Sequence, residues 1–95
     1  MVHSIVQVIP QEDFKVICYF DDGIIKMFDV KPFLNKGIFK KLSDIEVFKE
    51  TCTVLNNTLA WDLEGNFDPY NCIDLDPESI YSEGKSIKDP LIKTA

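Results

Sequence analysis

Apolar runs separated by short polar breaks dominate the first part of the chain. Ile5–Ile9 stops at Pro10, and the next two runs, Phe14–Phe20 and Ile24–Asp29, are separated by Asp21-Asp22-Gly23. β-Branched and aromatic residues favour strands, and proline cannot donate a hydrogen bond to a sheet. This pattern predicts a meander of three antiparallel strands.

The break between the second and third runs predicts a tight hairpin. Asp-Gly between apolar runs is typical of a two-residue type I′ turn, in which both central residues adopt positive φ. With Asp22-Gly23 at the tip, Phe20 is paired with Ile25 and Cys18 with Met27. That face is wholly apolar and is predicted to line the core.

Two short helices are indicated by capping signals. Ser43 followed by Glu46 has the spacing of a capping box, so a helix is predicted to begin after Ser43. Asp76 as cap and Pro77 at the first helical position predict a second helix, which ends at Gly84.

A second hairpin is predicted between the two helices. Its strands are Thr51–Leu55 and Leu59–Asp62, joined by Asn56-Asn57, because asparagine tolerates positive φ. Trp61, at the end of this hairpin, is predicted to pack in the core with its indole N–H near a carbonyl. The alternative is an anchor at a protein interface.

Together these elements predict an α+β fold. We expect a small single domain over residues 1–84, with an antiparallel strand meander, one inserted short helix, a second hairpin and a short C-terminal helix. Residues 85–95 contain few apolar anchors and are predicted to be a C-terminal tail without firm order.

The charge of the chain argues against nucleic-acid binding. The net charge is −6, all ten basic residues are lysine, and residues 61–95 carry eight acids against three lysines. Proteins that read nucleic acids need a basic stripe, usually with arginine, so no direct nucleic-acid binding is expected. The N-terminal residues lack a signal-peptide pattern and no apolar run suits a membrane span, which predicts a cytoplasmic protein.

Candidate catalytic and metal-binding residues are few. Cys18, Cys52 and Cys72 are widely spaced, with His3 as the single histidine, so neither a zinc site nor a thiol–histidine pair is predicted. Cys18 is predicted to be a buried and inert core residue, and Cys72 the more reactive thiol. No cofactor is expected, and the protein is predicted not to be an enzyme.

An acidic loop with aromatic residues is the candidate partner surface. It contains Asp62, Glu64, Phe67, Asp68 and Tyr70. The start of the loop has the spacing of a calcium loop, but the glycine that such a loop needs is replaced, so no metal is predicted. Aromatic residues among acids fit an interface with a basic protein partner. Alternatively, the acids keep the protein in solution and the aromatics pin the loop to its own core. Sheet edges left by the meander also suit a homodimer.

The ordered combination of these segments resembles a known family. It comprises Phe20–Gly23, Phe28–Pro32, Gly37–Leu42, Phe48, Leu59–Asp62 and Ile73–Tyr81, and is similar to the small bacterial family known as domain of unknown function 2442. The resemblance implies a small α+β fold and no catalytic residues. Some members are fused to a helix-turn-helix domain, and others lie beside genes for small partner proteins, as toxin–antitoxin pairs do. The loop Leu63–Cys72 is longer here than is usual in the family.

The functional expectation is a non-enzymatic cytoplasmic protein-interaction module, the antitoxin-like or accessory half of a two-gene pair. One alternative is a regulatory module of a transcription system that acts through a separate DNA-binding chain. Another is an enzyme with an unrecognised carboxylate site.

Overall fold

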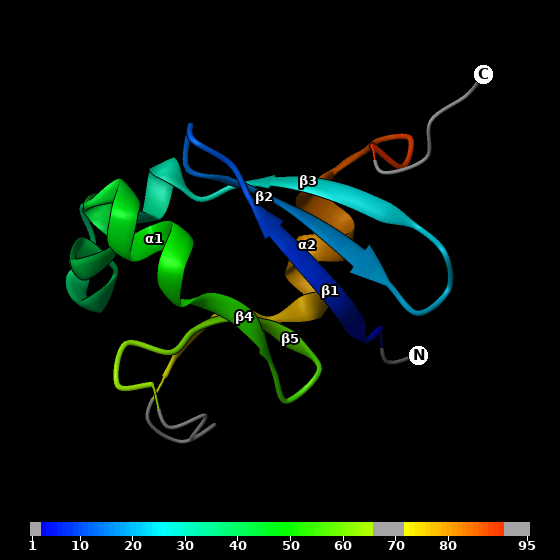
Figure 1. The fold of residues 1–95 in the computed structure, drawn as a ribbon. Coiled ribbons are helices and arrows are strands. Elements are labelled where there is room, and N and C mark those ends of the chain that lie inside the picture. Colours follow the sequence, from blue (N-terminus) through cyan, green and yellow to red (C-terminus); the bar gives the residue numbers. More distant parts are fainter. Residues whose placement is uncertain (1–2, 66–71, 91–95) are drawn as a thin grey trace.

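Two antiparallel sheets face each other across a single core, with the helices η1, η2 and α1 gathered at one end (Figure 1). The computed structural model describes residues 3–65 and 72–90. The strands are β1 (Ile5–Pro10), β2 (Lys15–Phe20), β3 (Ile25–Asp29), β4 (Cys52–Leu55), β5 (Thr58–Trp61), β6 (Ile73–Asp74) and β7 (Lys85–Ser86). The helices are η1 (Lys31–Phe33), η2 (Gly37–Ser43), α1 (Ile45–Thr51) and α2 (Pro77–Glu83), of which η1 and η2 are 3₁₀ helices. This arrangement confirms the α+β fold.

The first sheet has the strand order β1-β2-β3-β7, and its central hairpin differs in register from the prediction. Cys18 is paired with Lys26 rather than Met27, and Tyr19 with Ile25. The loop has three residues instead of two, and within it Gly23 alone has positive φ, at 89°. A type I turn closed by a left-handed residue is the usual three-residue hairpin loop, and its additional residue moves the pairing by one position.

The β1–β2 connection is also tight, and it contains no glycine. Phe14 occupies the left-handed region with φ 63°, so β2 begins at Lys15 and not at Phe14 as the apolar run suggested. The Gln11 amide donates to the Lys15 carbonyl at 2.8 Å and closes the turn. In β1 the pairing shifts at Val6, which is 60% exposed. A bulge of this kind on an edge strand discourages pairing with other chains.

The second sheet has the strand order β4-β5-β6. Its hairpin turns at Asn56-Asn57 as predicted, with β4 beginning one residue later and β5 lying one residue earlier than predicted. Asn56 and Asn57 both have positive φ, at 52° and 64°, and Leu55 is paired with Thr58 across the turn. This is the two-residue turn with both central residues left-handed that was expected for the other hairpin. The Asn57 carbonyl also accepts a hydrogen bond of 2.9 Å from the Ile5 amide, which joins the turn to β1.

Helix α1 begins one residue later than predicted. Its cap is Asp44, whose side chain accepts from the Glu46 amide at 3.0 Å. Ser43 instead belongs to η2, and its hydroxyl donates to the Lys40 carbonyl. Either residue type can cap a helix, so the competing 3₁₀ turn decides between them.

Helix α2 has the predicted caps, and the chain continues in regular structure beyond it. The Asp76 side chain accepts from the Glu78 amide, Pro77 is at the first helical position, and Gly84 ends the helix. The next two residues, Lys85–Ser86, form β7 and pair with β3. The first residues of the segment predicted as a tail therefore belong to the first sheet.

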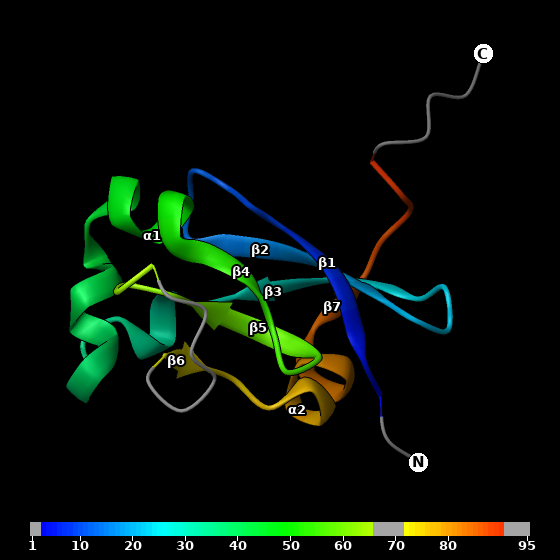
Figure 2. The ribbon, with the colours of Figure 1, turned by 60° about the horizontal axis from the view of Figure 1, so that its bottom comes forward.

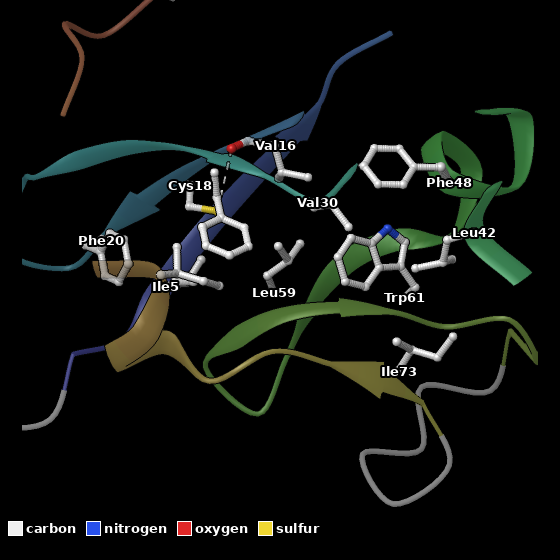
Figure 3. Packing of buried hydrophobic residues seen from close by; sticks show 12 residues of the cluster. Ile5, Val16, Cys18, Phe20, Val30, Leu42, Phe48, Leu59, Trp61 and Ile73 are labelled. Carbon is white, nitrogen blue, oxygen red and sulfur yellow. Dashed lines mark hydrogen bonds between the residues drawn. The ribbon is translucent and has the colours of Figure 1, made fainter. Parts of the chain in front are cut away.

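The core lies between the two sheets (Figure 3). Side chains from β2 and β3 meet Leu59 and Trp61 of β5, and Phe48 of α1 closes the end of the molecule where the helices gather. Trp61 is fully buried, as predicted for a core residue.

Candidate functional site

A hollow of about 190 Å³ lies where η2 meets the end of the second sheet, in the part of the molecule shown at the left of Figure 2. We refer to it as the η2 pocket. It is lined by Ile38 and Lys41 from η2, and by Trp61, Leu63, Glu64, Cys72 and Ile73 from β5, β6 and the segments beside them. Its volume is below the roughly 300–1,000 Å³ of typical small-molecule sites. A cavity of about 150 Å³ holds one benzene ring, so the η2 pocket has room for one large apolar side chain.

The 3₁₀ geometry of η2 determines which of its side chains reach the pocket. Side chains three residues apart lie on one face of a 3₁₀ helix. Ile38 and Lys41 therefore share the face that lines the pocket, whereas Phe39 and Leu42 share the face that packs on the core. Ile38 is 56% exposed and lies beside the hollow.

The sheet provides an apolar floor opposite Ile38. Trp61 and Ile73 are paired between β5 and β6, and both side chains are buried. Leu63 follows the strand and is partly buried. The floor is thus built from a cross-strand pair, a rigid support for an apolar contact.

The indole N–H of Trp61 was predicted to lie near a carbonyl. Among the described residues, no group accepts a hydrogen bond from Nε1. Figure 3 shows the nitrogen on the edge of the indole that faces Phe48, away from Ile73. The ring centroids of Trp61 and Phe48 are 5.6 Å apart with the ring planes tilted by 40°, so the two aromatic rings pack against each other in the core.

The structure separates the residues of the predicted partner surface. Glu64 is exposed and lines the η2 pocket. Asp62 is only 7% exposed, and its carboxylate accepts from the Gly65 amide at 3.1 Å, so it holds the turn after β5. Phe67, Asp68 and Tyr70 lie outside the described residues.

Ile38 and Lys41 were not identified from the sequence. The apolar residues at 38, 39 and 42 share one face of an α-helix, so the sequence pattern gives no reason to separate Ile38 from the core. In the 3₁₀ helix that forms, a period of three places Ile38 on a different face from Phe39 and Leu42.

The three cysteines differ in environment. Cys18 is buried, as predicted, and burial raises the pKa of its thiol to about 12, with a smaller contribution from the neighbouring Cys52. Burial also raises the pKa of Cys52 to about 12. Both thiols are therefore protonated and poorly nucleophilic at neutral pH. Cys72 lines the η2 pocket.

A network around His3 is the other notable polar cluster. The His3 amide donates to Glu78, its ring Nδ1 lies 2.6 Å from the same carboxylate, and its imidazole stacks on Tyr81 with centroids 3.6 Å apart. The Tyr81 hydroxyl donates to Asp22 at 2.8 Å. The pKa of Glu78 is lowered, chiefly by the His3 amide, and that of Asp22 by the Ile24 amide and then by the Tyr81 hydroxyl.

The network joins three elements of the fold. It connects the segment before β1 to α2 and to the tip of the β2–β3 hairpin. Both carboxylates have lowered pKa values, so they are ionised at neutral pH and accept hydrogen bonds rather than donate protons. These contacts suit the attachment of α2 to the first sheet.

Residues 3–65 and 72–90 contain no cluster of metal ligands and no membrane-spanning helix. Within these ranges, no three His, Cys, Asp or Glu side chains are grouped so that they could hold a metal ion. None of the helices described in them has the length and apolar character needed to cross a membrane.

Comparison with known proteins identifies the family. The model of the family described as "Protein of unknown function (DUF2442)" matches residues 5–86. The match covers most of the chain, so the protein belongs to this family. No curated protein and no solved structure matches the chain.

Proposed function

We propose that this member of the DUF2442 family is a non-enzymatic, cytoplasmic protein-interaction module, the antitoxin-like or accessory half of a two-gene pair. It binds its partner through the η2 pocket, which receives one apolar side chain. The observation that carries the proposal is the exposed Ile38 beside an apolar floor, with Lys41 and Glu64 at the same hollow. An apolar centre with a charged rim is the usual anatomy of a protein interface.

The partner as a whole is proposed to be basic. The chain carries a net charge of −6, and eight of its acids lie in residues 61–95. Whole-molecule charge steers diffusional encounter and raises the association rate with an oppositely charged protein. The association rate should therefore fall as added salt screens this attraction.

The test is co-expression with the product of the adjacent gene, followed by co-purification with three forms of the protein. These are the wild type, Ile38→Asp and Val6→Asp. Val6 is the matched control because it is 60% exposed, close to Ile38 at 56%, but lies on β1. Loss of an anchor side chain at an interface typically lowers the affinity about 30-fold.

We expect Ile38→Asp to lose the partner and Val6→Asp to retain it. Fluorescence of the single tryptophan, Trp61, reports occupancy of the η2 pocket because its indole lines the pocket. Equal retention of the partner by both variants would overturn the η2 pocket as the interface. A helix-turn-helix protein as the partner would favour the regulatory alternative over the two-gene pair.

A further inference from the structure

The segment that carries η2 has a charge opposite to that of the whole chain. Residues 31–43 contain four lysines and no acid, within a protein of net charge −6. All four lysines, at positions 31, 36, 40 and 41, are exposed. The lysines that form ion pairs within the described residues are Lys15 and Lys49 instead. The four ammonium groups thus have no carboxylate partner in the described part of the chain.

Three of these lysines lie within three residues of the exposed Ile38 in the sequence. Lys41 lines the η2 pocket on the same helical face as Ile38. Lys40 lies next to it on η2, and Lys36 immediately precedes the helix, with Nζ 6.0 Å from the ring centroid of Phe33. Because a short 3₁₀ helix is compact, a chain bound over Ile38 passes close to several ammonium groups at once.

On this basis we propose that the η2 pocket binds a protein segment in which one large apolar side chain is flanked by Asp or Glu residues. This inference rests on the proposed function and adds the chemistry of the docking segment. The apolar side chain fills the space of about 190 Å³ against Trp61 and Ile73. The flanking carboxylates lie over η2, and Glu64 on the sheet side of the pocket keeps them there by like-charge repulsion.

The local charge of this segment and the overall charge of the partner are separate properties. A basic protein can carry a short acidic segment, and steering at long range depends on net charge whereas docking depends on the nearest charges. The two kinds of segment can be told apart because a charge reversal in the pocket changes their affinities in opposite directions. Reversal of Lys41 weakens binding of an acidic segment and strengthens binding of a basic one.

The test uses three capped peptides as probes. Their sequences are Asp-Glu-Phe-Glu-Asp, Lys-Lys-Phe-Lys-Lys and Asp-Glu-Ala-Glu-Asp, each titrated into the ¹⁵N-labelled protein while amide shifts and the Trp61 indole resonance are followed. The acidic phenylalanine peptide should bind about three- to ten-fold more tightly than the basic one, because several exposed charge pairs each contribute modestly. The alanine peptide should bind more weakly than the acidic phenylalanine peptide, because it lacks the anchor.

Two variants assign the effect to the η2 pocket. Lys41→Glu should reverse the order of the acidic and basic phenylalanine peptides. Lys85→Glu is the matched control, because it makes the same change in net charge at an exposed lysine on β7 and should leave the order unchanged.

Each outcome separates this inference from the proposed function. If both phenylalanine peptides bind equally, or the basic one binds more tightly, the proposal of an acidic docking segment is wrong, while the pocket remains a docking site. If Lys85→Glu changes the peptide-induced amide shifts as much as Lys41→Glu does, the acidic-segment proposal is wrong, because the peptides are then attracted by net charge and not by the η2 pocket. If no peptide perturbs residues around the pocket, both proposals fail. Sedimentation measures whether the protein self-associates. If it does and Lys41→Glu abolishes the self-association, a second copy of this chain occupies the pocket and the inference is wrong.

Discussion

Phe14 has a backbone conformation that is costly for a bulky residue. Its φ is 63°, and its ring packs edge-on against Phe48 of α1 with centroids 5.2 Å apart. The left-handed conformation costs an L-residue roughly 1–2 kcal/mol, and glycine escapes this cost. The ring is partly buried, so its removal should cost about 2 kcal/mol, about half of the loss for a fully buried phenylalanine. Phe14→Ala loses the packing and keeps the strain, whereas Phe14→Gly loses the packing and relieves the strain.

The free energy of unfolding should therefore be about 1 kcal/mol higher for Phe14→Gly than for Phe14→Ala, the reverse of the usual order of these residues. Urea denaturation followed by Trp61 fluorescence measures the difference. The same pair of substitutions at Phe39, which lies inside η2, is the control, and there alanine should be the more stable. If alanine is as stable as glycine at position 14, the strain argued from φ is wrong.

Three shorter predictions concern other parts of the fold. Gly23→Val should lower the stability by about 1–3 kcal/mol in a thermal melt, since φ is 89° and nothing lies within 4 Å of the added Cβ, which leaves backbone strain as the cause. Iodoacetamide should label Cys72 before Cys18 and Cys52 in native protein, as mass spectrometry can determine. The lowered pKa of Glu78 adds stability that is present above its ordinary value of 4.5 and is lost as the pH falls below it. Glu78→Gln should therefore lose less stability than wild type between neutral pH and acid.

The two hairpins show where sequence patterns suffice for prediction and where they do not. Asn56-Asn57 form the turn as predicted, because a two-residue loop needs two residues that tolerate positive φ. Asp22-Gly23 carries an equally strong signal, yet Gly23 alone is left-handed there. The same residues suit a two-residue or a three-residue loop, and the packing of Val16 and Phe28 in the core favours the second. Local turn chemistry thus predicted both hairpins, whereas tertiary packing set the register of one of them.

Helix ends were predicted well where one signal stood alone. Asp76, Pro77 and Gly84 match their predicted positions because no other element competes for them. At the start of α1, two adjacent capping residues compete, and the outcome depends on Ser43 completing η2. The sequence contains no local measure of that competition, since η2 is held by packing of Leu42 in the core.

The candidate site could not be predicted because its two halves come from distant segments of the chain, which only the tertiary fold brings together. The acidic second half suggested the region around Glu64, which does line the η2 pocket. The opposing half, Ile38 and Lys41, lies on a short 3₁₀ helix that no capping side chain marks in the sequence. The net charge of −6 also gave no indication of this half of the site, because a total over the whole chain does not show the local stretch of four lysines. A protein of this size presents local fields that differ in sign from its total, and docking responds to the local field since salt screens charges more than about 8–10 Å away. The chemistry of the partner should therefore be inferred from the side chains that line the pocket.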